Sequence, residues 1–231
     1  MTIRLVSFDL DGTLVDTAAE IAEAVHRAFD DVGIERRPQA EITNLIGRGT
    51  RELMLKLLAR VMLEKPALSE RVQPEAVLER FEHHYAETAG CFGKPYPGCV
   101  ETLERLRDQG VRLVCVTNKE QRHAERVLAV TRLDGYFSML IGGDTLPVKK
   151  PHNGVLTHVL RHHGVSADHA AHVGDSSIDI ESARNAGVRA WAVPYGYNAG
   201  VPIEDSNPDR LFPNLSAIAD EVDAVLGPLP A

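Results

Sequence analysis

Short apolar runs alternate with amphipathic helical patterns along most of this chain, and this alternation restricts the fold more than any other feature. A parallel sheet gives such a pattern, because its strands are buried on both faces and are connected by helices. The helical patterns that end at Gly110 and Gly164 have typical glycine stops. We therefore predict an α/β fold with a parallel sheet whose strands are residues 3–10, 111–117, 138–141, 170–173 and 189–193.

The segment from residue 17 to residue 92 departs from this alternation, because it contains helical patterns and no convincing strand. Thr17 and Glu20 have the spacing of a capping box, so we predict a helix that begins there. The Pro- and Gly-rich residues 93–98 suit a hinge. We therefore expect a core and an inserted helical domain, with boundaries at 1–16 and 93–231 for the core and 17–92 for the insert.

Charge and hydropathy exclude several classes of partner. The formal net charge of -8 argues against nucleic acid, since binding a phosphate backbone needs a basic face. No apolar run approaches the roughly 20 residues of a membrane span, and the N-terminal residues lack a signal-peptide pattern. The cysteines at 91, 99 and 115 have no pairing pattern, as expected of reduced thiols. We predict a cytoplasmic protein without a membrane partner, and the sequence leaves a homodimer open.

Two carboxylates, Asp9 and Asp11, follow the first predicted strand where it enters a glycine turn. Ligands collect at the carboxyl ends of parallel strands. Hydrolysis of a phosphate ester needs a nucleophile, a charge-neutralising metal and a proton donor. Asp9 can attack phosphorus to give an acyl phosphate, and Asp11 can protonate the leaving oxygen. The alternative is an acidic turn that caps a helix, since Asp-Gly is common in turns.

The later predicted strands end in groups that complement this pair. Thr117 and Asn118 can donate hydrogen bonds to a phosphate. Lys150 can neutralise the nucleophile and the transferring phosphoryl group. Asp175 and Asp179 suit Mg²⁺ with water ligands. Each group alone is a weak signal, but four of them in strand order predict a magnesium-dependent phosphatase of a small phosphorylated metabolite.

These residues resemble the four motifs of the haloacid dehalogenase superfamily of phosphohydrolases, D-x-D-G-T-x-x-D, T-N, K-P and G-D-S-x-x-D. The match spans nearly the whole chain and implies a Rossmann-like core with a helical C1-type cap inserted after the first motif. It also implies roles for individual residues: Asp9 as nucleophile, Asp11 as acid-base, Thr117, Asn118 and Lys150 as phosphate ligands, and Asp179 and Thr13 in support. Mg²⁺ would be held by Asp9, Asp175 and the backbone carbonyl of Asp11.

Shorter segments resemble bacterial phosphoglycolate phosphatases more narrowly. They are Tyr96-Pro97-Gly98, Thr117-Asn118-Lys119, Gly142-Gly143-Asp144, Lys149-Lys150-Pro151 and Tyr195-Gly196-Tyr197-Asn198. This resemblance implies hydrolysis of 2-phosphoglycolate to glycolate and phosphate through a phospho-aspartate. One departure is Asn153, which stands where that family usually has a proline.

The predicted insert also contains a glycine-flanked arginine, Arg48, and Arg51 close by. Either guanidinium can bind the carboxylate of phosphoglycolate in a bidentate manner. A solvated arginine in a turn is the alternative.

Several residues bear on the alternative functions. Asp11 argues against a dehalogenase, which typically lacks the second aspartate. Lys56 and Lys65 stand in ordinary helical contexts, which argues against a phosphonate hydrolase with a Schiff-base lysine. A non-catalytic phosphate-binding protein would be expected to lack some of the acidic groups and the lysine. A sugar phosphomutase, or a phosphatase of another small ester, stays open because it uses the same core motifs.

Overall fold

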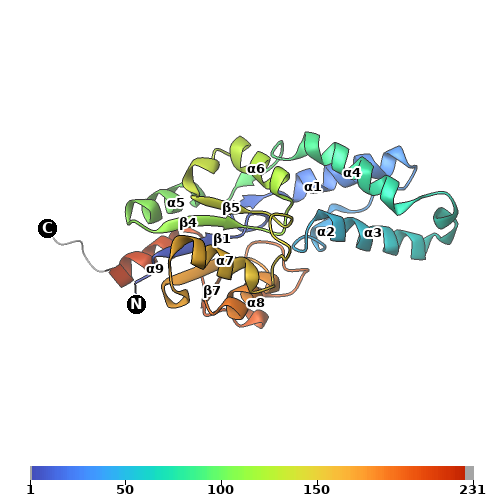
Figure 1. The fold of residues 1–231 in the computed structure, drawn as a ribbon. Coiled ribbons are helices and arrows are strands. Elements are labelled where there is room, and N and C mark those ends of the chain that lie inside the picture. The colour runs from blue at the N-terminus through green and yellow to red at the C-terminus, as the bar shows by residue number, and fades with distance from the viewer. Residues whose placement is uncertain (1, 227–231) are drawn as a thin grey trace.

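A computed structural model describes residues 2–226 of the chain and contains a six-stranded sheet of order β5-β4-β1-β6-β7-β8 (Figure 1). All paired strands of this sheet run parallel. Their bounds are β1 Leu5–Phe8, β4 Arg112–Val116, β5 Met139–Ile141, β6 Ala170–Gly174, β7 Arg189–Ala192 and β8 Arg210–Leu211. The five predicted strands are confirmed. The edge strand β8 was not predicted, because a two-residue strand has no recognisable period.

Successive strand residues point to opposite faces of the sheet, and each face has its own apolar cluster. In β1, Val6 and Phe8 pack in the first cluster, whereas Leu5 packs in the second. Helices α5 (Cys99–Asp108), α6 (Gln121–Val130) and α9 (Ser216–Leu226) contribute to the first cluster, and α7 (Gly154–His163) and α8 (Ser177–Ala186) to the second. Burial on both faces explains why the strands are continuous apolar runs.

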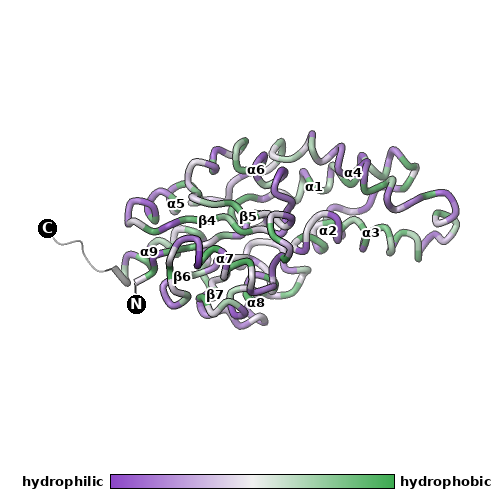
Figure 2. The backbone as a smooth tube through the Cα atoms, in the orientation of Figure 1, coloured by the Kyte–Doolittle hydropathy of each residue, from purple (hydrophilic) through white to green (hydrophobic). Residues whose placement is uncertain are grey.

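The predicted glycine stops are also confirmed. The α5 helix ends just before Gly110, where φ is +77°, and α7 ends at Gly164, where φ is +61°. Figure 2 shows hydrophobic stretches in the centre of the sheet and hydrophilic ones on outer helix turns. Among residues 2–226, no helix is long and apolar enough to cross a membrane.

Residues 17–92, all of which the structure describes, contain helices and no strand. The helices are α1 Ala18–Asp31, α2 Gln39–Thr43, α3 Thr50–Glu64, the short 3-10 helix η1 Pro66–Glu70 and α4 Pro74–Thr88. Figure 1 shows them extending from one end of the sheet, opposite the end where both chain termini lie. The segment begins and ends at an antiparallel pair of short strands, β2 (Val15–Asp16) and β3 (Lys94–Pro95).

The capping box predicted at the start of α1 is wrong. Thr17 precedes the helix, but its hydroxyl donates to Asp11 Oδ1 at 2.7 Å. The Glu20 carboxylate accepts hydrogen bonds from the backbone N–H groups of Gly90 (2.8 Å) and Gly93 (3.0 Å). Buried N–H groups must find acceptors, so these tertiary contacts replace the local cap.

Candidate active site

The predicted catalytic residues converge at the carboxyl ends of β1, β4 and β6, beside the loop that follows β5. Asp9 follows β1, Thr117 and Asn118 follow β4, and Asp175 follows β6. All four side chains are buried, as is Lys150. The parallel order β5-β4-β1-β6 explains the convergence, because it brings the four motifs side by side at one edge.

Lys150 lies between two of the carboxylates. Its Nζ is 3.0 Å from Asp9 Oδ1 and donates to Asp179 Oδ1 at 2.6 Å. Burial alone would raise the pKa of Asp179, but Lys150 and His172 hold that pKa below its usual range. Burial would lower the pKa of Lys150, yet the charges of Asp179 and Asp9 raise it. The lysine is therefore a fixed positive charge beside Asp9.

Asp179 acts here as a support for that lysine. Its Oδ2 accepts hydrogen bonds from the backbone N–H and the hydroxyl of Ser176, at 3.1 and 2.6 Å. The backbone bond is one half of a capping box at the start of α8, and in the other half the Ser176 side chain accepts from the backbone N–H of Asp179. His172 Nε2, completely buried beneath, lies 3.2 Å from Asp179 Oδ1. The carboxylate is thus held by one helix start and by a strand residue.

Three buried carboxylates, Asp9, Asp175 and Asp179, offer oxygen atoms within 4.8 Å of one another. Burial raises the pKa of Asp9 to about 6, with a contribution from Asp179 and Asp11 and against the effect of Lys150. Burial and the charges of Asp179 and Asp9 also raise the pKa of Asp175 well above its usual range. Such crowding of negative charge fits a hard divalent cation with oxygen ligands. This grouping consists of side chains alone, whereas the third predicted ligand was the backbone carbonyl of Asp11.

Asp175 is enclosed on several sides. Thr13 Oγ1 donates to its Oδ1 at 2.5 Å, and the backbone N–H of Tyr197 donates to its Oδ2. A Cβ atom added at Gly12 would lie 2.4 Å from Asp175 Oδ2, and one added at Gly196 would lie 2.2 Å from it. Because glycine has no Cβ atom, these two positions leave room for the Asp175 carboxylate, and any other residue at either position would overlap it.

Asp11 makes contacts that were not predicted from the sequence. Lys119 Nζ donates to both of its carboxylate oxygens, at 2.7 and 2.9 Å, and Thr17 donates to Oδ1. The Lys119 side chain is completely buried and lies over the Tyr85 ring, 5.0 Å from its centroid. Lys119 follows Thr117 and Asn118 directly in the sequence, so its position after the strand could have predicted that it lies at the site.

A small, partly open pocket lies between the strand ends and the helical segment. The strand ends contribute Asp9, Asp11, Thr117, Asn118 and Lys119. The helical segment contributes Ile21, Ile46, Gly47, Gly49, Thr50 and Leu53. The two sides also touch, since Asn118 Nδ2 donates to the Gly47 carbonyl at 3.0 Å and Thr50 donates to Glu120 at 2.7 Å.

The structure places Arg48 and Arg51 outside this pocket. Arg48 is about half exposed, faces Glu52 at 3.8 Å and lines a neighbouring groove beside α8. Arg51 is exposed. The reason is helix geometry: Thr50 and Leu53 share the face of α3 that lines the pocket, and Arg51 projects from another face.

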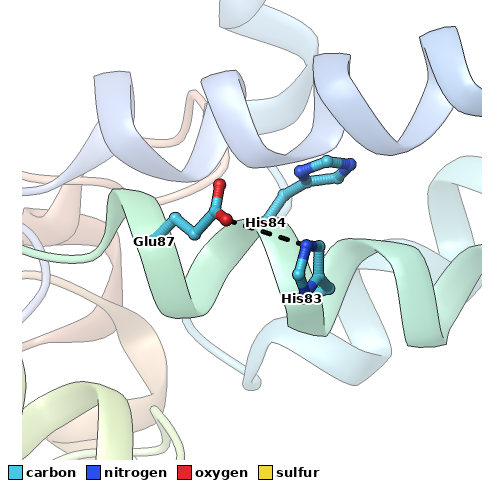
Figure 3. A group of neighbouring side chains, drawn as sticks. All are labelled: His83, His84 and Glu87. Atoms are coloured by element: carbon cyan, nitrogen blue, oxygen red, sulfur yellow. Dashed lines mark ion pairs between the residues drawn. The ribbon is translucent and has the colours of Figure 1, made fainter.

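A second group of metal-ligand side chains lies on α4, away from the pocket. Figure 3 shows His83, His84 and Glu87 over one stretch of this helix. His83 Nε2 is 3.7 Å from Glu87 Oε1, and His84 Nε2 is 2.8 Å from Asp31 Oδ2. His83 and Glu87 are mostly exposed, and His84 already has a carboxylate partner. The buried aspartates at the strand ends are therefore the better cation site.

Comparison with known proteins agrees with this arrangement. Residues 6–193 match the model of the haloacid dehalogenase-like hydrolase family, and the chain belongs to that family. It is 39% identical to a phosphoglycolate phosphatase of Aliivibrio fischeri over 90% of this chain and 91% of that protein. It is 40% identical to phosphoglycolate phosphatase 1 of Pseudomonas aeruginosa over 92% of this chain and 77% of that protein.

A solved structure has the same fold. A crystal structure of a predicted phosphoglycolate phosphatase from Haemophilus somnus superposes with a TM-score of 0.89 and 30% identity, and covers 96% of this chain and 99% of that one. The predicted α/β fold and the family resemblance are confirmed.

Proposed function

We propose that this chain is a phosphoglycolate phosphatase, a phosphoric monoester hydrolase that converts 2-phosphoglycolate to glycolate and phosphate. The observation that carries this proposal is the buried trio of Asp9, Lys150 and Asp175 at the strand ends, of which Asp9 lines the pocket. Two relatives of 39% and 40% identity, both named phosphoglycolate phosphatases, support the choice of substrate.

In the proposed reaction, Asp9 attacks phosphorus and a phospho-aspartate forms as the bond to the ester oxygen breaks. Thr117 and Asn118 bind the phosphate oxygens, and Lys150 stabilises the charge that develops on them. Asp11 donates a proton to the leaving oxygen and then takes one from the water that hydrolyses the phospho-aspartate. Its contacts with Lys119 and Thr17 hold the carboxylate at the pocket wall.

We further propose Mg²⁺ as the cation of the site, held by Asp9, Asp175 and the backbone carbonyl of Asp11. When bound, it would supply positive charge to the transferring phosphoryl group. Asp179 supports the site by accepting a hydrogen bond from Lys150, and Thr13 supports it by donating one to Asp175.

The helical segment 17–92 serves as a cap in this proposal, over a core of residues 1–16 and 93–231. Its apolar residues Ile21 and Leu53 line the pocket and keep water from the reacting groups. Arg48 and Arg51 lie outside the pocket, so the helical segment must rearrange before either can bind the substrate carboxylate. We also propose a cytoplasmic location, which the free cysteines at 91, 99 and 115 support.

Phosphate release by the purified protein, with and without Mg²⁺, tests the proposal. The substrates are a panel of small phosphate esters that includes 2-phosphoglycolate, and an Asp9→Asn variant is the control. We expect magnesium-dependent turnover with a preference for 2-phosphoglycolate and no turnover by the variant. Preference for another ester would keep the mechanism and contradict the substrate, and release from none would point to a mutase or a binding role.

A further inference from the structure

The pocket contains a cation, Lys119, to which the proposed reaction assigns no contact with the substrate. Of the described residues that line it, only Lys119 carries a positive charge. Lys150 is not among them, and its ammonium group already pairs with Asp9 and Asp179. An ammonium group has three N–H donors, and those that Lys119 gives to Asp11 all end on one carboxylate. The ammonium group also lies over the Tyr85 ring, 5.0 Å from its centroid, and within residues 2–226 it donates no third side-chain hydrogen bond.

The position of Lys119 relative to Asp11 is the second argument. A general acid must come within hydrogen-bond distance of the leaving ester oxygen. Lys119 Nζ lies 2.7 Å from Asp11 Oδ1, so it is held next to the place where that oxygen must sit. In 2-phosphoglycolate a single methylene group separates the ester oxygen from the carboxylate. The carboxylate therefore reaches Lys119 without leaving the pocket.

The walls of the pocket favour this pairing. Ile21, Ile46 and Leu53 surround the polar end, and an ion pair is stronger where apolar side chains exclude water. The other basic side chains near the opening have different partners: Lys149 donates to the Arg48 carbonyl and lies 3.8 Å from Glu52.

We propose that Lys119 forms the carboxylate-binding subsite of this pocket and selects small phosphate esters with a carboxylate one carbon from the ester oxygen. This inference rests on the proposed phosphatase function and assigns its specificity to the strand-end side of the pocket. Lys119 holds Asp11 and the substrate carboxylate together, so it is also a positioning residue for the proton donor.

The test compares two esters, 2-phosphoglycolate and 2-hydroxyethyl phosphate, which has a neutral hydroxyl in place of the acid. The enzymes are the wild type, Lys119→Met and the matched control Lys149→Met, whose side chain is partly exposed and does not line the pocket. A charged hydrogen bond contributes about 1.5–3 kcal/mol, so Lys119→Met should lose about 10- to 100-fold more kcat/KM on 2-phosphoglycolate than on the neutral ester. Lys149→Met should keep the wild-type ratio.

Turnover of the neutral ester also reports that each variant is folded, and Lys119→Gln serves as the second variant if Lys119→Met does not fold. Equal losses on both esters would overturn the inference and leave Lys119 a role through Asp11 alone. A wild type that prefers neither ester contradicts the carboxylate subsite and the proposed substrate, while its turnover still supports a phosphatase. A wild type that hydrolyses neither ester contradicts the phosphatase function and this subsite with it.

Discussion

The two sides of the pocket use charged residues in opposite ways. At the strand ends, Lys150 and Asp179 are almost completely buried, with side chains 1% exposed. On the helical segment, Arg37 pairs with Glu41 and Glu64, whose side chains are 18% and 49% exposed. A buried charge has lost its hydration, so its partner is needed to keep the folded state stable. Solvent screens the attraction between exposed charges, so such pairs contribute little to stability. An ion pair is therefore essential at the strand ends and nearly dispensable around Arg37.

The inward faces differ as well. The strand ends present carboxylates, an amide, a hydroxyl and a lysine to the pocket, while the helical segment presents mainly Ile21, Ile46 and Leu53. We infer that the strand ends carry the chemistry and the carboxylate selection, and that the helical segment supplies an enclosing wall. Three substitutions would break or sharpen this contrast.

Lys150→Met should have the largest effect. It leaves the buried Asp9 and Asp179 without their counter-charge and removes the cation beside the phosphoryl group. We expect kcat for 2-phosphoglycolate to fall by about 10²–10³ and the free energy of unfolding to fall by about 3–5 kcal/mol. Steady-state kinetics and urea unfolding measure the two, with the partly exposed Lys149→Met as control. A variant within tenfold of wild-type kcat would contradict the contrast.

Glu20→Gln should have an intermediate effect on the free energy of unfolding, because Glu20 is a buried carboxylate of the helical segment. Burial raises its pKa from 4.5 to about 7, with Lys119 lowering it in opposition. The folded state keeps a proton that the unfolded chain has released, so the free energy of unfolding falls as pH rises from 4.5 to 7. This contribution is on the order of 3 kcal/mol.

Glutamine does not ionise, so the stability of Glu20→Gln should change less with pH across that interval. Urea unfolding of both proteins between pH 4.5 and 8 measures this difference. Parallel stability curves would show that the Glu20 pKa is not raised by folding.

Arg37→Ala should have the smallest effect. Its ion pairs with Glu41 and Glu64 are at or near the surface, and such pairs contribute about 0–1 kcal/mol. We expect a small loss of thermal stability and an unchanged kcat for 2-phosphoglycolate. A loss as large as that of Lys150→Met would remove the distinction between the two sides.

The sequence was sufficient for five of the six strands, and it placed the residues of the four motifs at strand ends. The five longer strands are apolar because both their faces are buried, and this signal is local in the chain. Asp9, Asp11, Thr117, Asn118, Lys150 and Asp175 each follow a strand or its loop, so the parallel topology alone brings them together.

Contacts between distant segments could not be read in the same way. The spacing of Thr17 and Glu20 is that of a capping box, yet Asp11 and the N–H groups of Gly90 and Gly93 compete for those side chains in the fold. Arg48 has the expected charge but lies outside the pocket. Lys119 has a positive charge and lines the pocket, and its 2.7 Å contact with Asp11 is visible only in the fold.

The close approach of Gly12 and Gly196 to Asp175 has a consequence for how the chain can vary. Neither glycine has a reactive group, yet even a methyl group at either position would overlap the carboxylate. In a survey of all single substitutions, these two positions should tolerate as little change as Asp175 itself. The site is thus specified in part by glycines, which have no side chain, and a search for reactive residues does not find them.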